Sequence, residues 1–348
     1  MRCLTGRRPP PLRKVLVTGS AGFIGFHLSQ LLLAEGFQVV GVDKLTSYYD
    51  VRLKQARRAL LHEHAAYRDE VIDITDADAT ARCIAAAQPE IIVHLAAQAG
   101  VRHSLEHPRA YVDTNVGGTF NVMEAARALG IAHLLIASTS SVYGANPDLP
   151  FRETQACKTP LTIYAATKQA TEVMAHSYAS LWGLQTTMFR FFTVYGPWGR
   201  PDMALFKFTK GILEGTPIDI YNGGEMYRDF TYVADLVRAI RLLIDMPPAG
   251  PATPSAPIVG DSLSPVAPYR IVNIGNSRKV RLLDLVEELE ACLGRRALRN
   301  YLPMQPGDVP ATWADATLLH ALTGYRPTTD VPDGVRAFVA WYRAYYAV

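Results

Sequence analysis

The stretch KVLVTGSAGFIG at residues 14–25 joins a short β-branched run to three glycines with the spacing Gly-x-x-Gly-x-x-Gly. The first five residues predict a strand, and the apolar pattern of residues 23–34 predicts a helix directly after the glycines. In such a unit Gly19 permits the sharp turn, Gly22 lets a diphosphate approach the backbone, and Gly25 lets the helix pack on the strand. Because the diphosphate then meets the helix N-terminus, this stretch predicts a dinucleotide-binding site.

The alternation of strand and helix signals continues through the first half of the chain. Further apolar runs of strand length lie at 37–42, 90–95, 132–137 and 185–191. Helical patterns lie at 77–87, 111–129 and 164–182. Such alternation predicts an α/β fold of the Rossmann type, with a doubly wound parallel sheet, helices on both faces and ligands at the carboxyl ends of the strands.

A change of composition near residue 195 predicts two parts. Glycine, proline and aromatic residues become denser there, and the segments become shorter. We expect residues 14–194 to form mainly an NAD-binding domain and residues 195–348 mainly a smaller mixed α/β substrate-binding lobe, with some chain crossing between the two. Residues 246–268 are rich in proline, alanine and serine, which predicts a surface loop. Residues 1–13 contain no apolar core of signal-peptide length and are expected to be a disordered leader.

The composition is that of a soluble globular enzyme and narrows the choice of partners. The 348 residues are 49% hydrophobic and 19% charged, which suits one large or two closely packed domains. A net charge of +3 with mixed signs along the chain offers no basic stripe for nucleic acid or a membrane surface, and no apolar run is long enough to span a bilayer. The four cysteines are too scattered for a metal site or a redox pair, so we expect no metal, reduced thiols and a cytoplasmic location.

The segment YAATK places Tyr164 and Lys168 one helical turn apart. A free tyrosine has a pKa of about 10, but a cation one turn away and a cationic nicotinamide both favour its phenolate form. A phenolate could then accept the proton of a substrate hydroxyl whose carbon loses hydride. The same pattern also occurs on ordinary surface helices as a solvated lysine beside a packed ring, but the glycine turn upstream favours the catalytic interpretation.

Acidic residues at strand ends are candidates for the adenosine end of the cofactor. Asp43 follows the second strand about 20 residues after the glycines, where a carboxylate binds the ribose hydroxyls and repels a 2′-phosphate, so NAD is expected over NADP. Lys44 beside it softens that repulsion. An ordinary strand-end turn is the alternative for Asp43. Asp73 either reaches the adenine or acts as a helix N-cap before Asp76.

Eight segments together resemble the extended short-chain dehydrogenase/reductase family of NAD-dependent nucleotide-sugar epimerases and dehydratases. The resemblance runs from about residue 14 to 345 and rests on TGSAGFIG, VDKLTSYYD, HLAAQAGVR, ASTSSVYG, YAATK, FRFFTVYGPWGRPDMA, YRDFTYVADL and PGDVPATWAD. It implies that Thr139 hydrogen-bonds the sugar 4-oxygen, that Tyr164 is the base, and that Lys168 holds the nicotinamide ribose. It also implies a homodimer formed through the helices at 111–129 and 164–182.

The resemblance extends to further contacts. Besides the glycines, Asp43, Lys44, Asp73, Tyr164 and Lys168, the expected cofactor contacts are Phe23, Ile24, Ile74, Leu95, Ala96, Ala97, Asn115 and Phe191. On the substrate side Tyr221 is expected to lie against uracil, and Arg228 and Asp308 are expected at the diphosphate and ribose. A surface salt bridge with Asp229 is the alternative for Arg228.

The residues after Thr139 separate the branches of this family by chemistry. Sugar 4,6-dehydratases carry Asp and Glu there because elimination of water needs an acid and a base, and decarboxylating relatives carry the glutamate. This chain has Ser140 and Ser141, whose hydroxyls are neutral donors suited to a carboxylate. Thr193 replaces the asparagine of galactose-type epimerases and leaves room for a charged C6 group. The alternative for each of these hydroxyls is strand-end hydrogen bonding.

These expectations converge on an isomerase that uses NAD to invert C4 of a UDP-sugar, with UDP-glucuronate and UDP-galacturonate as its pair. Arg200 would supply charge near the carboxylate or diphosphate, and an exposed loop arginine is its alternative. Epimerisation of neutral UDP-glucose or UDP-N-acetylglucosamine is the nearest competing activity. A non-catalytic NAD-binding protein is the competitor from another class, and the intact set of Thr139, Tyr164 and Lys168 argues against it.

Overall fold

The computed structural model describes residues 13–252 and 258–348. Except for Arg13, the predicted disordered leader therefore lies outside the described residues, as does the middle of the proline-rich segment. Among the described residues, no helix combines the length and apolarity that a membrane span requires.

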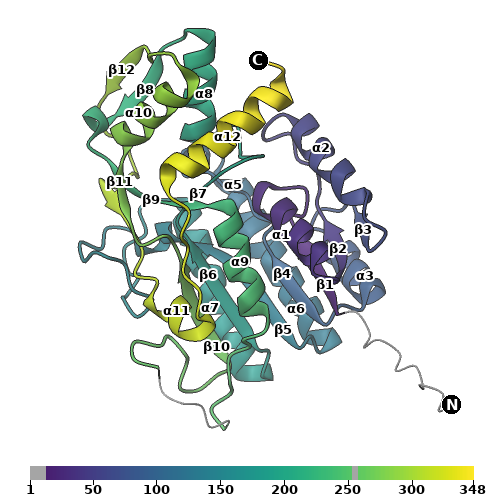
Figure 1. The fold of residues 1–348 in the computed structure, drawn as a ribbon. Helices are drawn as coiled ribbons and strands as arrows, with labels where there is room; N and C mark the ends of the chain where they lie inside the picture. The colour runs from purple at the N-terminus through teal and green to yellow at the C-terminus, as the bar shows by residue number, and fades with distance from the viewer. Residues whose placement is uncertain (1–12, 253–257) are drawn as a thin grey trace, which may run out of the picture.

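A seven-stranded, fully parallel sheet forms the centre of the molecule, in the order β10-β6-β5-β4-β1-β2-β3 (Figure 1). Its strands are β1 (Lys14–Thr18), β2 (Gln38–Val42), β3 (Tyr67–Glu70), β4 (Ile91–His94), β5 (His133–Thr139), β6 (Thr186–Phe191) and β10 (Tyr269–Ile274). The strand order reverses between β1 and β4, and the carboxyl ends of strands diverge at such a point to leave a ligand crevice. The predicted doubly wound parallel sheet is confirmed.

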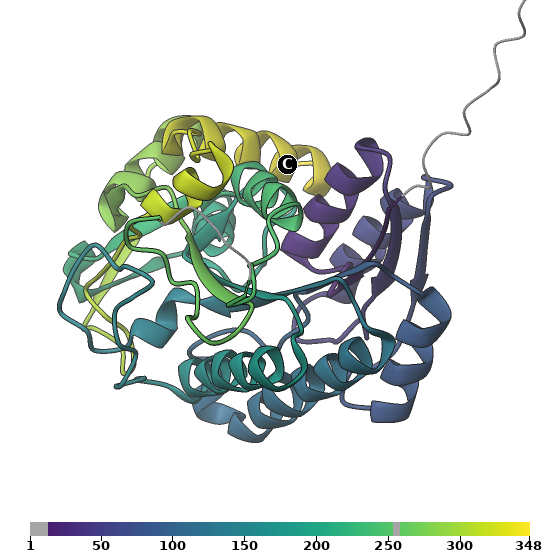
Figure 2. The same ribbon diagram turned by 90° about the horizontal axis from the view of Figure 1, so that it is seen from below.

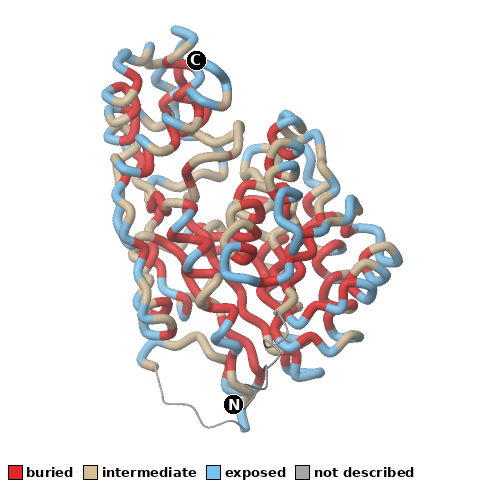
Figure 3. Tube along the Cα trace, turned by 45° about the vertical axis from the view of Figure 1, so that its right-hand side comes forward, coloured by how far each residue is buried: buried red, intermediate tan, exposed pale blue. Residues whose placement is uncertain are grey.

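Helices cover both faces of this sheet, as the view from below shows (Figure 2). One face buries a core with α1 (Phe23–Ala34), α2 (Val51–His62), α9 (Val233–Ile244) and α11 (Thr317–Thr323). The other buries a core with α3 (Ala77–Ala87), α6 (Thr119–Leu129) and α7 (Ile163–Trp182). The buried residues concentrate along the strands between these two layers (Figure 3).

Helix α2 is absent from the sequence prediction, and one predicted helix is interrupted. Helix α2 reads VRLKQARRALLH and does not carry the apolar periodicity that identifies a helix. The predicted helix 111–129 consists of α5 (Pro108–Tyr111), the π-helical turn η1 (Val112–Gly118) and α6. The short helix α4 (His103–Glu106) precedes them.

The smaller lobe packs its own core between short strands and three helices, at the upper left of Figure 1. Its helices are α8 (Ala204–Glu214), α10 (Leu282–Leu293) and α12 (Val331–Tyr346). Its strands are β7 (Thr193–Tyr195), β8 (Ile218–Tyr221), β9 (Tyr227–Tyr232), β11 (Lys279–Arg281), β12 (Arg299–Leu302) and β13 (Ala311–Thr312). Strand β9 pairs with β7, β11 and β13, and β8 pairs with β12.

The chain crosses between the two halves after residue 194. Strand β10 and helices α9 and α11 belong to the central sheet and its covering layer, although they follow β7 in sequence. The described residues between α9 and β10 form neither helix nor strand. Part of this loop lies along the outer edge of β10, where Ser262 Oγ accepts a hydrogen bond from Ile271 N at 3.0 Å and Arg270 pairs with Asp261 at 2.9 Å. The loop therefore covers an edge strand that would otherwise be open.

Candidate active site

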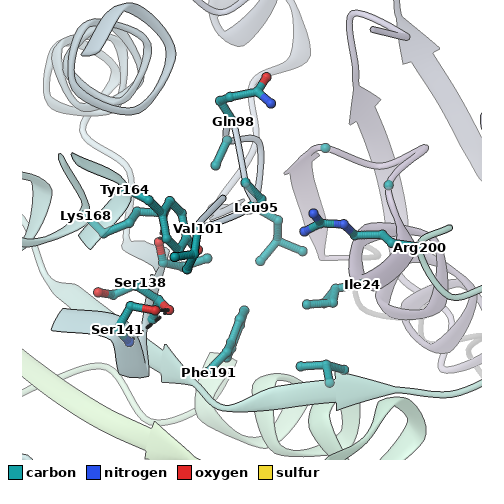
Figure 4. Close-up of a pocket in the computed structure, with 18 of the residues that line it drawn as sticks. Ile24, Leu95, Gln98, Val101, Ser138, Ser141, Tyr164, Lys168, Phe191 and Arg200 are labelled. Atoms are coloured by element: carbon teal, nitrogen blue, oxygen red, sulfur yellow. Dashed lines mark hydrogen bonds between the residues drawn. The ribbon is translucent and has the colours of Figure 1, made fainter. Parts of the chain in front are cut away.

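A cavity of about 430 Å³ lies in the crevice at the carboxyl ends of the strands and is lined from both halves (Figure 4). It brings together nearly all the residues that the sequence singles out. Those in its lining are Gly19, Gly22, Phe23, Ile24, Gly25, Asp43, Lys44, Asp73, Ile74, Leu95, Ala96, Ala97, Thr139, Ser140, Ser141, Tyr164, Lys168, Phe191, Thr193, Arg200, Arg228 and Asp308.

The glycine turn fits a dinucleotide diphosphate. Gly19 has φ +72°, and an added Cβ at Gly22 or Gly25 would lie 2.9 or 2.1 Å from the Gly19 carbonyl oxygen. Side chains are therefore excluded at these three glycine positions on steric grounds. Helix α1 begins directly after Gly22 with no side-chain cap, so its first N–H groups are left for a ligand.

The part of the cavity where the adenosine was predicted to bind contains a buried ion pair that the sequence prediction missed. Asp43 Oδ1 accepts from Leu45 N at 2.8 Å and from Lys54 Nζ at 3.3 Å, and both side chains of the pair are less than 10% exposed. Lys44 turns away to Asp73, 3.0 Å distant. The cation beside Asp43 is therefore Lys54, a lysine on the buried face of α2, and not its sequence neighbour.

The interpretation of Asp73 as a helix N-cap is wrong. The N-cap of α3 is Asp76, whose side chain accepts from Ala79 N at 2.9 Å. Asp73 instead accepts from Thr75 N at 3.0 Å and from Lys44 and lines the cavity. Its carboxylate lines the cavity, and the contact with adenine stays a prediction.

Tyr164 and Lys168 stand at the start of α7, beside the end of β5 (Figure 4). Lys168 is 2% exposed, its Nζ donates to Ala137 O at 2.8 Å, and burial lowers its pKa to about 8 although Glu172 opposes the shift. Burial raises the pKa of Tyr164, while its hydrogen bond with Thr139 and the charge of Arg200 lower it. Thr139 and Arg200 are therefore the side chains that favour the Tyr164 phenolate.

Three hydroxyl residues and no carboxylate form the wall next to Tyr164. Thr139 Oγ1 accepts from Ser141 N at 3.2 Å and donates to Ser141 Oγ at 3.3 Å, within a 3₁₀ turn η2 (Ser140–Tyr143). Thr193 adds a hydroxyl residue from β7. The carboxylates that line the cavity each have a cationic partner elsewhere: Asp43 with Lys54, Asp73 with Lys44, and Asp308 with Arg228.

The two candidate substrate arginines are held by carboxylates. Arg200 Nη2 donates to Asp202 at 2.5 Å, which also accepts from Tyr48 OH at 3.1 Å, and Asp202 raises the pKa of Arg200 in opposition to burial. The interpretation of Arg200 as an exposed loop arginine is wrong, because its side chain is only 21% exposed.

Arg228 pairs with Asp308 at 2.6 Å. The alternative pairing with Asp229 is wrong, because Asp229 is fully buried and accepts from the backbone N–H groups of Asn276 and Ser277 at 2.7 and 2.9 Å. Alternating side chains of β9 point to opposite faces, which places these neighbours in different surroundings.

Two predicted contacts lie outside the lining. Asn115 is fully buried behind the wall, where its Oδ1 accepts from Gln98 N at 2.8 Å and its Nδ2 donates to Thr167 Oγ1 at 3.1 Å. Tyr221 is covered by the guanidinium of Arg102, 4.5 Å from its ring centre. Gln98 and Tyr48 do line the cavity and were missed, although both stand inside motifs that the sequence made conspicuous.

A Rossmann sheet with a glycine turn and a Tyr-x-x-x-Lys pair beside it defines the short-chain dehydrogenase/reductase class. Residues 15–275 match the model of the NAD dependent epimerase/dehydratase family, and the chain belongs to that family.

Several of the similar proteins are named UDP-glucuronate 4-epimerase. The chain is 52% identical over 333 residues to a "Probable UDP-glucuronate 4-epimerase" of Rhizobium meliloti, covering 96% of this chain and 98% of that one. It is 44% identical to UDP-glucuronate 4-epimerase 1 of Arabidopsis thaliana, over 95% of this chain and 77% of that one. The UDP-glucuronic acid 4-epimerase of Bacillus cereus, solved with UDP-glucuronic acid and NAD, superposes with a TM-score of 0.85 at 32% identity, over 96% and 100% of the two chains.

Proposed function

We propose that this protein is an NAD-dependent UDP-glucuronate 4-epimerase that interconverts UDP-glucuronate and UDP-galacturonate. The observation that carries the substrate assignment is the wall of Thr139, Ser140 and Ser141 beside Tyr164, which offers hydroxyls where dehydration would need an acid and a base. The names of the similar proteins support the same activity.

In the proposed mechanism the chain's own residues move one proton and hold the sugar. Tyr164, as phenolate, accepts the proton of the 4-hydroxyl, while Thr139 hydrogen-bonds the 4-oxygen and Lys168 holds the cofactor ribose. The chemistry that NAD would supply when bound is the uptake of hydride from C4 and its later return to C4. The 4-keto sugar turns about its diphosphate so that the opposite face of C4 would receive the hydride, and Tyr164 gives the proton back to the 4-oxygen. No net oxidation results.

The hydroxyls of Ser140, Ser141 and Thr193 would bind the C6 carboxylate. Hydrogen bonds to a charged group are stronger than neutral ones, so this wall favours an acid over a neutral hexose. Arg200 would add positive charge near the carboxylate or diphosphate. Because none of the carboxylates in the lining belongs to this wall, proton abstraction at C5 has no evident base there.

The remaining contacts belong to the nucleotide. Arg228 and Asp308 would meet the diphosphate and ribose side, since both line the cavity from the smaller lobe. Tyr221 would lie against uracil with the part of its ring that the side chain of Arg102 does not cover.

A second copy of the chain would cover the outer face of α6 and α7. Phe120, Val173, Leu181 and Trp182 are between 45% and 69% exposed there, and Tyr178 joins Phe120 and Trp182 through ring contacts. An apolar strip on two neighbouring helices suits an isologous dimer. Light scattering should give a dimer mass for the wild type and a monomer mass for Val173→Glu with Leu181→Glu. A monomer mass for the wild type would contradict the proposed dimer.

We also place the protein in the cytoplasm. Cys83, Cys157 and Cys292 are free thiols in the structure, as expected for a reducing compartment.

The activity is tested by mixing purified protein with UDP-glucuronate and UDP-glucose in parallel in heavy water. We expect UDP-galacturonate that keeps its original hydrogen at C4, because hydride leaves and returns on the same cofactor. Deuterium at C4 would contradict the mechanism, and deuterium at C5 would indicate a dehydratase-like reaction. Comparable turnover of UDP-glucose would instead identify an epimerase of neutral sugars.

A further inference from the structure

Arg57 on α2 is a fully buried arginine that joins three separate segments of the chain. Its Nη1 donates to Ala21 O at 3.0 Å and to Tyr49 OH at 2.8 Å. Its Nη2 donates to Trp198 O at 2.5 Å and lies 3.5 Å from Gly199 O. All four acceptors are neutral oxygens, and Nε has no partner within the described residues.

Such an arrangement is not explained by stability alone. A buried guanidinium stays charged, and removing it from water is costly when no carboxylate compensates it. An apolar side chain of similar volume could fill the same space on α2 without that cost. What only an arginine provides here is a planar fork that reaches carbonyl groups on two sides at once.

The two sides that Arg57 joins are the cofactor turn and the loop that carries Arg200. Ala21 lies in the glycine turn, between Gly19 and Gly22. Trp198 and Gly199 directly precede Arg200, which lines the cavity.

A second contact fixes the same loop, residues 196–203. His27 on α1 approaches Pro197 O with its Nε2 at 2.9 Å, and burial lowers the pKa of His27 to about 4. The imidazole is therefore neutral at physiological pH and donates from Nε2. Trp198, which has φ +60°, packs its ring on Phe26 at 5.5 Å. The loop is thus tied to the helix whose N-terminus belongs to the cofactor site.

We propose that Arg57 is a positioning residue for the sugar end of the site: by tying residues 196–203 to the cofactor turn it holds Arg200 in place, and it makes the order of this loop depend on bound NAD. The role assigned to Arg200 rests on the proposed function. The tie between the turn and the loop rests on the hydrogen bonds alone.

The kinetic test is a double-mutant cycle with Arg57→Gln and Arg200→Gln. Arg57→Gln should lower kcat/KM for UDP-glucuronate at least tenfold, and it should have little further effect once Arg200 is replaced, because both changes remove the same interaction. The control is Arg58→Gln on the same helix, which loses a part-exposed ion pair with Asp69 and should retain wild-type kinetics. Losses that multiply in the double variant would overturn the proposal.

The second test measures hydrogen exchange of the backbone amides in residues 196–203, with and without NAD. In the wild type, NAD should slow exchange in this loop as well as in the glycine turn. In Arg57→Lys, which keeps the charge and most of the stem, the turn should still respond and the loop should not. A loop that responds equally in both proteins would overturn the proposal. If the wild type fails to epimerise UDP-glucuronate, the proposed function fails, and the exchange result still decides the role of Arg57.

Discussion

The two ends of the cavity are built in different ways. The cofactor end is lined by the glycine turn and by residues that follow β2, β3 and β4, and it contains one buried ion pair, between Asp43 and Lys54. The sugar end consists of side chains from β5, β7, β9 and two loops that lie far apart in sequence. A site made of backbone tolerates most side-chain changes outside its glycines, whereas a site made of side chains can change its ligand by single substitutions. Selectivity for the sugar should therefore reside at the second end.

The largest effect is expected from Tyr164→Phe, which should stop catalysis at the sugar end and leave NAD binding at the cofactor end unchanged. The variant keeps the ring and loses the proton acceptor, so turnover should fall by about 10²- to 10⁴-fold while NAD stays bound. Steady-state rates and the absorbance of retained cofactor measure the two quantities. Tyr178→Phe on the same helix, outside the cavity lining, is the control and should keep its rate. Retention of more than about a tenth of the wild-type rate would show that another group is the base.

Substrate preference tests whether the sugar end alone sets selectivity. UDP-glucuronate should be preferred over UDP-glucose by at least about 10²-fold in kcat/KM, because a site built to hydrogen-bond a group rejects analogues that lack it. Thr193→Val should reduce that ratio mainly by weakening the acid substrate. Equal slowing of both substrates would mean that the hydroxyl only completes hydrogen bonding at the end of β7.

Asp43→Ala tests the buried ion pair at the cofactor end. Loss of charge-assisted hydrogen bonds to the ribose should weaken NAD by on the order of 1.5–3 kcal/mol. Removal of Asp43 also frees the buried Lys54, so NADP should improve relative to NAD. Titration of cofactor-free protein measures both affinities. Lys44→Ala, which breaks only the part-exposed pair with Asp73, should change NAD affinity far less. Unchanged NAD affinity in Asp43→Ala would place this carboxylate outside the site.

The smallest effect is expected from Lys168, and it concerns the pH dependence of the free energy of unfolding. Burial lowers the pKa of Lys168 from 10.5 to about 8, so between these values the unfolded chain binds more protons than the folded one. This group therefore makes folding more favourable as pH rises, by about 1 kcal/mol between pH 8 and pH 9. Urea unfolding of cofactor-free protein should show the wild type gaining that amount relative to Lys168→Met. The free energy of unfolding of the exposed Lys207→Met variant should rise with pH as in the wild type. If that of Lys168→Met rises equally between pH 8 and pH 9, Lys168 is not the source of the pH dependence.

The contrast between the two ends of the cavity also explains which features could be predicted from the sequence. Glycine spacing and apolar periodicity are local signals, so β1, α1, β2 and the glycine turn are predicted to within about one residue. Arg57 and Lys54 are invisible to such signals, because charged side chains on a helix suggest a solvated face until the packing partner is known. The partner of Arg228 lies 80 positions away at Asp308, and only the fold brings the two together.

The late position of β10 has a consequence for how the chain folds during synthesis. Strand β6 gains its outer neighbour only after roughly 80 more residues have been added, which takes on the order of 4–16 s at usual rates of translation. Throughout that interval the nascent sheet presents an unpaired strand edge, the kind of surface on which other chains can add by strand pairing. A fragment ending near residue 194 would keep that edge permanently. Such a fragment is therefore expected to aggregate more readily than the whole chain, and expression of the whole chain should depend on how quickly β10 and its covering loop reach the sheet.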